Sequence, residues 1–570
     1  MTIHRLLVLC LGVLLLASAS AHAQMTPDPS QPASAPPAGA YTVTVPASAR
    51  LSPVILPLSL LPGIHGPKLV GTTPHHPFQF RIPATGQEPL TYACADLPHG
   101  LALDAKTGII SGAITAAGSF TLHLAVSNSQ GTAQRPLTIV SGNHPLALTP
   151  PMGWDAGNFY ANQVNDDNVR DAADWLIKSG LAAHGYSYIN VGDSWQGLRD
   201  KKTGLIRPNI HRFPDMKALG DYLHGNGLKF GLYSSATEHT CGGYQGSAGH
   251  AAQDADTYAD WGVDYLEYSW CPAAALDTQT PPTDQSAAFI NMRADLSKTN
   301  RDIVYAVNTF GRSVPWHWQT TVGANSWVTA QTYLDDWPSV YKALWFMPRF
   351  QVSEPSSPGH WNNIGQLMVG KLGADTLRKT RLTDTEQMSQ LTQCALLSAP
   401  LWLSCDLSSL DPNVFHHSVT AMLTNDEVLD VDQDPAGHGA SLLSAMTVMQ
   451  TSVYPFANVV TGQAWAKPLS DGTAAVGLFN FSSTAENITV NLADLHLSGE
   501  QPVRDLWLHA DLPAATSAFT AAVPPHGVAL VKIGTPGGPI LSIGAQPTTL
   551  NAPVQIGSAR PIGLAISEKL

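Results

Sequence analysis

The sequence predicts a multidomain protein in which a (β/α)8 TIM barrel lies between two β-rich domains. Its 570 residues are enough for roughly three or four domains of ordinary size. Over residues 145–437, short apolar segments alternate with helical ones, as expected for parallel strands joined by helices. The segments on either side show the apolar–polar alternation of antiparallel strands instead.

The composition indicates a globular protein and disfavours nucleic acid as a partner. Hydrophobic residues make up 44% of the chain, enough for real cores, and charged residues only 13%. The 43 acidic residues outnumber the 30 Lys and Arg, so the formal charge is −13. A protein that follows a phosphate backbone is expected to be basic.

The first 23 residues have the pattern of a secretory signal peptide. A basic start at His4 and Arg5 precedes an apolar run over residues 6–16 and a small-x-small sequence at 21–23. This run is too short to span a membrane, and no later stretch is long enough. We expect a secreted or periplasmic protein with no membrane association after signal removal. Residues 24–40, rich in Pro, Ser and Ala, are expected to form a linker.

The cysteines and histidines give no sign of a metal site. Five cysteines remain after signal removal, so at least one thiol stays free if all pairing is internal. The sequence has no CxxC pair and no other metal-ligand spacing. We therefore expect no metal and no cofactor.

The domain before the barrel, residues 41–142, has short strand-like runs separated by turn residues. Its runs LPHGLALD (97–104) and TGIISG (107–112) resemble the recurring pattern of immunoglobulin-like modules attached to secreted bacterial enzymes. The resemblance implies an immunoglobulin-like β-sandwich and says little about function. After the barrel, residues 438–534 predict a C-terminal antiparallel β-sandwich, and residues 535–570 a Gly/Pro-rich tail.

The barrel segment carries ordered landmarks. They include PPMGW at 150–154, YINV at 188–191, RFPDMKAL at 212–219, TCGGY at 240–244 and DQDP at 432–435. With these landmarks, the chain from Thr149 to about Ile533 resembles the α-galactosidases and α-N-acetylgalactosaminidases of glycoside hydrolase family 27. The resemblance implies hydrolysis of O-glycosyl bonds, a carbohydrate substrate, and a disulfide between Cys241 and Cys271.

The catalytic positions of that family differ in this chain. Retaining glycosidases need two carboxyl groups about 5 Å apart. By the resemblance, the nucleophile position falls on Ser269, in the run EYSWC, and the acid/base position on Thr332. A serine hydroxyl is a poor nucleophile without an activating base, and a threonine is no general acid at neutral pH. The usual two-Asp machinery is therefore replaced, which implies an altered specificity or mechanism.

Two other carboxylates near predicted strand ends are candidate catalytic groups. Side chains two apart on a strand share a face, so Glu267 is expected to point into the barrel mouth on the same side as Ser269. Glu354 lies near a later strand end. The alternative roles are an ion-pair partner for Glu267 and a solvated loop residue for Glu354.

The same mouth is where a barrel enzyme binds its substrate. Acids after strands can hold sugar hydroxyls or anchor loops, and aromatic rings can stack on a sugar or fill the core. The candidate substrate-binding residues are Trp154, Asp193, Tyr233, Trp270, Trp361 and Asp406.

Three functions agree with the sequence. The favoured one is a secreted α-galactosidase-like glycoside hydrolase with altered catalytic residues. The second is a catalytically inactive carbohydrate-binding protein on the same scaffold. The third, an adhesive or structural exported protein led by the immunoglobulin-like module, is less favoured because the barrel is long and keeps its landmarks.

Overall fold

The computed structural model describes residues 41–42, 45–272, 283–312, 315–329, 334–349, 356–373, 376–411, 418–450 and 457–543. The predicted signal peptide, the predicted linker and residues 544–570 of the predicted tail lie outside the described residues. No helix in the described part of the chain is long and apolar enough to cross a membrane.

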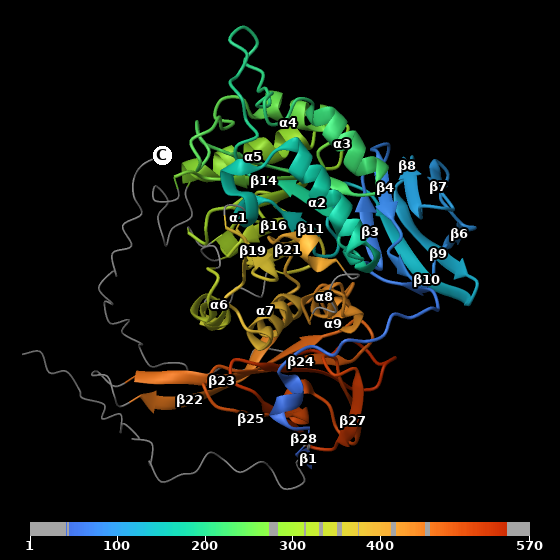
Figure 1. Cartoon of the computed structure of the whole chain (residues 1–570), viewed down its shortest axis with the longest axis vertical. Helices are drawn as coiled ribbons and strands as arrows, with labels where there is room; N and C mark the ends of the chain where they lie inside the picture. The colour runs from blue at the N-terminus through green and yellow to red at the C-terminus, as the bar shows by residue number, and fades with distance from the viewer. Residues whose placement is uncertain are drawn as a thin grey trace, which may run out of the picture. The chain divides into compact units, whose positions relative to one another are not determined.

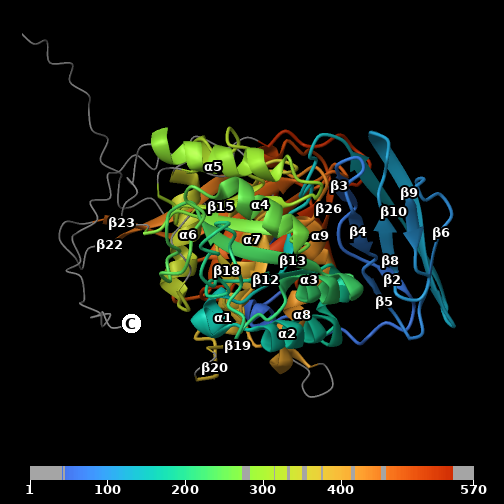
Figure 2. The same cartoon turned by 90° about the horizontal axis from the view of Figure 1, so that it is seen from above.

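The central domain is a barrel of parallel strands surrounded by helices (Figures 1 and 2), which confirms the expected architecture. The strands are β11 (Met152–Asp155), β12 (Tyr188–Val191), β13 (Lys229–Ser235), β14 (Tyr265–Ser269), β15 (Val304–Asn308), β16 (Ser326–Val328), β17 (Trp361–Asn363), β18 (Gln366–Leu367) and β21 (Leu401–Leu403). From β11 to β17 each strand pairs with the next along the chain. β18 pairs with β21, which pairs with β11, and β18 follows β17 after two residues, so this short connection joins the two ends of the sheet.

Helices follow the strands in alternation. They are α1 (Gly157–Tyr160), α2 (Asp166–Lys178), α3 (Met216–Gly225), α4 (Ala251–Asp260), α5 (Thr283–Leu296), α6 (Trp337–Arg349), α7 (Asp384–Leu397), α8 (Ser418–Leu423) and α9 (Asp426–Asp432). Capping residues in the local sequence determine where several of these helices begin. At the start of α7, for example, Thr383 and Glu386 form a capping box. A short hairpin of β19 (Lys371–Leu372) and β20 (Arg378–Lys379) precedes α7.

Alternate residues on the barrel strands face opposite sides. Ile189, Leu266 and Leu403 belong to the large core that also contains helix residues. Tyr188, Tyr265 and Trp402, each one position away, form a separate small cluster inside the ring. The period of two therefore decides which side chains line the interior.

The N-terminal module consists of antiparallel strands around its own apolar core, which confirms the immunoglobulin-like expectation. Its strands are β2 (Gly63–Ile64), β3 (Leu69–Thr72), β4 (Phe78–Arg81), β5 (Ala84–Thr85), β6 (Thr91–Cys94), β7 (Leu101–Leu103), β8 (Ile109–Gly112), β9 (Gly118–Asn128) and β10 (Gly131–Ser141). The sheets have the strand orders β3-β10-β9-β6 and β4-β8-β7, with β3 parallel to β10 and β2 paired with β5.

The C-terminal domain is an antiparallel sandwich, as expected. Its strands are β22 (Ser441–Gln450), β23 (Ala457–Pro468), β24 (Ala474–Asn480), β25 (Glu486–Asn491), β26 (Gln501–Asp505), β27 (Ala510–Ala515), β28 (Ala518–Val523) and β29 (Val528–Ile533). The larger sheet has the order β22-β23-β24-β29-β26-β27. Leu541 and Ile543 pack against this domain's core, so the first part of the predicted tail is attached to it.

The residues before the N-terminal module lie on the C-terminal sandwich, which corrects the expected start of the module at residue 41. Strand β1 (Tyr41–Thr42) runs parallel to β28. Arg50, at the end of the 3-10 helix Ala47–Arg50, is buried and pairs with Asp505 at 2.5 Å. A buried guanidinium needs such a carboxylate, which ties this segment to the sandwich and leaves β2 as the first strand of the module.

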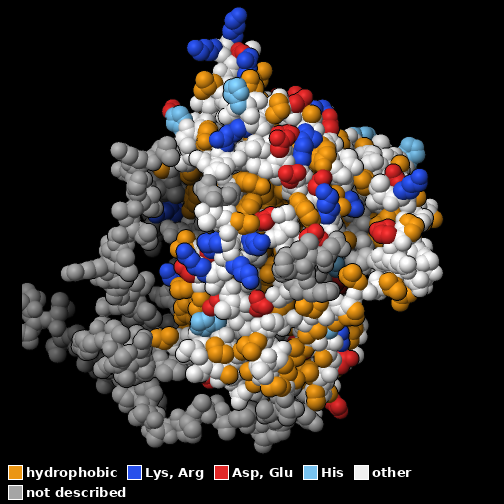
Figure 3. Space-filling model, viewed as in Figure 1, with side chains coloured by type: hydrophobic (Ala, Val, Ile, Leu, Met, Phe, Trp, Pro, Cys, Tyr) orange, Lys and Arg blue, Asp and Glu red, His pale blue; other side chains and the backbone are white. Residues whose placement is uncertain are grey.

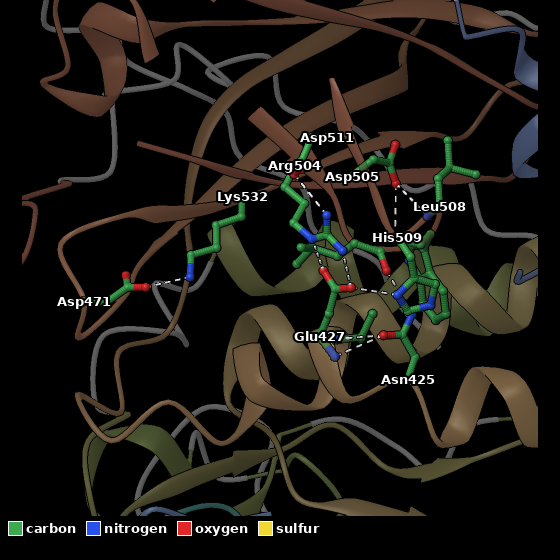
Figure 4. A network of polar contacts seen from close by, with 12 residues as sticks. Asn425, Glu427, Asp471, Arg504, Asp505, Leu508, His509, Asp511 and Lys532 are labelled. Atoms are coloured by element: carbon green, nitrogen blue, oxygen red, sulfur yellow. Dashed lines mark hydrogen bonds and ion pairs between the residues drawn. The ribbon is translucent and has the colours of Figure 1, made fainter. Parts of the chain in front are cut away.

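Polar contacts also join the barrel to the sandwich (Figure 4). Glu427, in the first turn of α9, accepts hydrogen bonds from Arg504 at 2.6 and 2.8 Å, and His509 Nδ1 lies 2.7 Å from the same carboxylate. Trp507 donates its indole N–H to Thr392 Oγ1 on α7 at 2.9 Å. The barrel and the C-terminal sandwich therefore form one continuous packed unit.

Candidate active site

Glu267 lies on the inner face of β14, two residues before the strand ends. It is half-buried, and its Oε1 accepts a hydrogen bond from Asn308 Nδ2 on β15 at 2.8 Å. No Lys or Arg forms an ion pair with it among the described residues. The expected position inside the mouth is therefore observed, and the ion-pair alternative has no partner in the described part of the chain.

A second inward carboxyl, Asp155, was missed by sequence reasoning. It is the last residue of β11, lies opposite Asn190 in the parallel register, and is 7% exposed. Its Oδ1 accepts hydrogen bonds from Gly157 N and Gln366 Nε2, both at 2.7 Å. The available signal was its place at the C-terminal end of the first barrel strand, directly after Trp154.

Asp155 and Glu267 interact electrostatically across the ring. Burial raises the pKa of Glu267 to about 7, and the charge of Asp155 adds to that rise. Burial also raises the pKa of Asp155 to about 6, although the polar groups of Gly157, Asn190 and Gln366 oppose the rise. Glu267 therefore stays protonated to a higher pH than Asp155, and two carboxyl groups with separated pKa values are typical of the acid pairs of hydrolases.

Ser269 is fully buried at the end of β14 and its hydroxyl is already engaged. Tyr233 Oη lies 2.6 Å from Ser269 Oγ, and the Ser234 carbonyl accepts from the same hydroxyl at 3.3 Å. Burial raises the pKa of the Tyr233 phenol, so the phenol stays protonated at neutral pH. In this form it cannot take the proton of the serine hydroxyl. Ser269 therefore has no activating base among the described residues around it.

Cys241 and Cys271 form a disulfide beside this group, which confirms the expected pairing. It joins the loop after β13 to the end of β14. Tyr233 Oη lies 3.4 Å from Cys271 Sγ. The disulfide therefore holds two loops of the mouth next to Ser269.

Asp193 and Asp406 are loop anchors in the structure. Asp193 accepts backbone hydrogen bonds from Ser194 N at 3.0 Å and Gly242 N at 2.8 Å. Asp406 accepts from Ser408 N and Ser408 Oγ at 3.1 and 2.6 Å. Their carboxylates thus hold the mouth loops in place, and this is the structural alternative that the sequence left open.

The three tryptophans expected to stack on a sugar differ in exposure. Trp154 and Trp361 are fully buried and donate their indole N–H groups to the carbonyls of Cys405 and Ala147. A fully buried ring has no open face for a sugar, so the stacking role is corrected for these two. Trp270 is half-buried next to Ser269, with its ring 6.1 Å from that of Phe289, and stays a candidate.

The loop after β12 forms an exposed part of the mouth rim. Arg199 fixes its base with hydrogen bonds to Asp254 at 2.7 and 2.6 Å. Leu198 is 78% exposed, and Lys201 and Lys202 are exposed at the tip, which projects at the top of Figure 3. The tip therefore presents cationic and apolar groups to the solvent.

Comparison with known families identifies this barrel and its sandwich. A family model described as α-galactosidase A matches residues 149–434, and the α-galactosidase C-terminal β-sandwich model matches residues 461–533. The chain belongs to the α-galactosidase family of glycoside hydrolases. An Ig domain model matches residues 62–142, in agreement with the module that begins at β2.

Three relatives show how far the similarity extends. α-Galactosidase 2 of Arabidopsis thaliana is 34% identical over 388 residues, covering 67% of this chain and 89% of that protein. A crystal structure from Bacteroides fragilis, 30% identical, has a TM-score of 0.75 and covers 85% of this chain and 100% of its own. The α-galactosidase of Saccharomyces cerevisiae solved with raffinose is 25% identical, with a TM-score of 0.60 and coverage of 70% and 100%.

Two predicted positions of this α-galactosidase-family site, Thr332 and Glu354, lie outside the described residues. Of the carboxylates predicted at the mouth, Glu267 interacts electrostatically with a second carboxyl, Asp155. Asp193 and Asp406 lie in loops at the mouth, where they accept hydrogen bonds from the loops.

Proposed function

We propose that this member of the α-galactosidase family is an exported glycoside hydrolase in which Asp155 and Glu267 replace the family's usual acid pair. One observation carries the proposal: two inward carboxyls in the upper part of the barrel have raised pKa values, about 6 for Asp155 because of burial, and about 7 for Glu267 because of burial and the charge of Asp155. Hydrolysis of a glycosidic bond needs one carboxyl as acid and another as base or nucleophile.

The pKa order supports a division of roles between the two groups. The carboxyl with the higher pKa, Glu267, is protonated at neutral pH and donates its proton to the leaving glycosidic oxygen as the bond to the anomeric carbon breaks. Asp155 is then the ionised partner, which either attacks the anomeric carbon or takes the proton of the attacking water. Asn308 orients Glu267, and Gln366 orients Asp155.

The substrate that we propose is a glycoside within an oligosaccharide or polysaccharide. The relative solved with raffinose supports this substrate class. By the family resemblance, Ser269 stands where the family has a charged group, and its small hydroxyl is engaged by Tyr233. This difference supports a sugar or linkage different from the family's usual one.

Export is supported by the signal-peptide pattern of residues 1–23 and agrees with the disulfide beside the site. Disulfides persist in oxidising compartments, so a secreted or periplasmic location fits both features. Fractionation of the native host, with the mature N-terminus determined by sequencing, tests this part of the proposal.

The enzyme proposal is tested by screening the mature protein against a panel of nitrophenyl glycosides that includes the α-galactoside. For any glycoside that is cleaved, Glu267→Gln and Asp155→Asn should each lower kcat/KM by roughly 10²- to 10⁴-fold, because each removes one proton-transfer group. Glu238→Gln is the matched control, because this exposed acid follows β13 on the same face of the barrel. Wild-type rates in both pair variants would refute the assignment.

The inactive carbohydrate-binding protein is the second candidate function. It is supported by Ser269, which by the family resemblance stands at the nucleophile position and whose hydroxyl is engaged by Tyr233. No turnover of any glycoside by folded protein, together with saturable binding on a glycan array, would support this candidate over the enzyme.

A further inference from the structure

Three metal-ligating side chains from distant parts of the chain meet outside the active site. His65 follows β2 of the N-terminal module, His184 ends the 3-10 helix Leu181–His184, and Asp426 begins α9. His65 Nδ1 lies 2.9 Å from Asp426 Oδ2, and His184 Nδ1 lies 2.8 Å from Asp426 Oδ1. The side chains are 17%, 15% and 33% exposed, so the cluster is sheltered but reachable from solvent.

Two glycines explain why the histidines meet. Gly66 and Gly185 directly follow His65 and His184, and both have positive φ, 73° and 106°. A Cβ added to Gly185 would lie 3.0 Å from the Gly66 Cα. Only residues without side chains allow the two backbones to approach so closely, and the approach brings the imidazole rings to 5.0 Å between centroids.

The donor set suits a zinc ion. Two imidazoles and one carboxylate are the ligands of open three-residue zinc sites, with water completing a tetrahedron. In a tetrahedral site with zinc at about 2.0–2.1 Å from each ligand, the ligand atoms lie about 3.3 Å apart. The contacts of the two histidines with Asp426 would therefore lengthen by about half an ångström when zinc binds. Among the described residues this is the one group of three such side chains whose ligand atoms all lie within 4.8 Å.

Neighbouring groups hold the ligands in orientation. His65 Nε2 lies 2.7 Å from Thr85 Oγ1, which fixes the ring with Nδ1 toward Asp426, as the outer partners of metal-bound histidines do. The nearby cation Arg135 is engaged by the carbonyls of Ile64 and Gly66. Asp426 is held on α9 next to Glu427, whose contacts with the sandwich are drawn in Figure 4.

We propose that His65, His184 and Asp426 bind a zinc ion that fastens the immunoglobulin-like module to the barrel. His184 precedes β12, so the site lies on the side of the barrel where the strands begin, opposite the catalytic mouth. Zinc there stabilises the junction of the domains and takes no part in glycoside chemistry.

The test uses the mature full-length protein without a histidine tag, in a Cys94→Ser background because Cys94 is a half-buried free thiol. After treatment with a chelator, zinc is added in a calorimeter and the melting temperature is measured with and without the metal. We expect one equivalent of zinc to bind and the melting temperature to rise. His65→Gln and His184→Gln should abolish both effects, and Thr85→Val should weaken binding roughly ten- to hundredfold.

His123→Gln is the matched control. His123 belongs to the same module and its Nδ1 lies 2.6 Å from Asp96, and the histidine is 77% exposed. The Cys94 thiol, which lies 3.2 Å from the same carboxylate, is removed in the Cys94→Ser background. This variant should bind zinc like the wild type. If a ligand variant folds poorly, the absorption of Co²⁺ in the visible range still reports whether a nitrogen-ligated site forms. Absence of zinc binding by the wild type, or binding that His65→Gln and His184→Gln leave unchanged, would overturn the proposal.

Discussion

The two ends of the barrel interior are built from the same strands but carry opposite chemistry. Where the strands begin, Tyr188, Tyr265 and Trp402 meet edge to face, with ring centroids 5.9, 5.8 and 5.0 Å apart. Two residues after Tyr265 on the same strand comes Glu267, whose pKa is raised to about 7. One strand thus places a ring in the aromatic floor formed by Tyr188, Tyr265 and Trp402, and an acid in the layer above it.

This difference predicts which residues of the barrel interior affect stability and which affect catalysis. The three buried rings provide apolar contacts, which lower the free energy of the folded state. The layer above contains the buried Asp155 and the half-buried Glu267, whose charged forms are disfavoured, a cost that the fold tolerates. We therefore expect substitutions in the floor to change unfolding, and substitutions in the carboxyl layer to change activity and pH dependence.

The largest effect on stability is expected in the floor. Trp402 is 2% exposed and contacts both Tyr188 and Tyr265, so Trp402→Ala should lower the free energy of unfolding by roughly 3–5 kcal/mol. Trp402→Phe, which keeps a ring in place, should cost less. Urea unfolding followed by far-UV circular dichroism measures both variants. An alanine variant as stable as the wild type would contradict a packed floor.

Period-two alternation allowed the barrel, and the inward direction of Glu267, to be predicted from the sequence. The same alternation explains an error: Trp154 precedes the inward Asp155, so its ring faces the helices instead of the mouth. The Asp155–Glu267 pair could not be predicted, because β12 and β13 separate their strands in the sheet and only ring closure brings them together. The same holds for Arg50 with Asp505, whose 455-residue separation leaves no local signal.

The next largest effect concerns pH and the carboxyl layer. The folded-state pKa of Glu267 is about 7, above its unfolded value of 4.5, so the folded state favours the protonated form. Its contribution to stability is complete below the unfolded pKa and is lost as the pH rises through the folded pKa. Glu267→Gln imitates the protonated acid, so it should match the wild type at pH 4 and exceed its stability by roughly 3 kcal/mol at pH 8.

Chemical denaturation of both proteins at the two pH values measures this difference. Asp155→Asn should show the same trend, with its transition at lower pH, because the folded-state pKa of Asp155 is about 6. Equal stability of Glu267→Gln and wild type at pH 8 would contradict the buried, charge-disfavouring environment.

The smallest effect is expected for the acids that anchor loops. The carboxylate of Asp193 already accepts hydrogen bonds from the amides of Ser194 and Gly242. Asp193→Asn should therefore cost about 1 kcal/mol of stability and change kcat/KM far less than Glu267→Gln or Asp155→Asn. Asp406→Asn should behave similarly. Thermal unfolding and initial rates, measured side by side, check both. A loss of activity as large as that of Glu267→Gln would contradict the loop-anchor role of Asp193 and support its predicted role in substrate binding.

The pH dependence of kcat/KM tests most directly whether Asp155 and Glu267 are the working acid pair. For a glycoside that the wild type cleaves, the pair predicts a bell-shaped profile with its maximum between the two pKa values, about 6 and about 7. Asp155→Asn should remove the acidic limb and Glu267→Gln the alkaline limb, and each variant should also lose most of the rate. A wild-type profile with both limbs intact in the two variants would contradict the assignment.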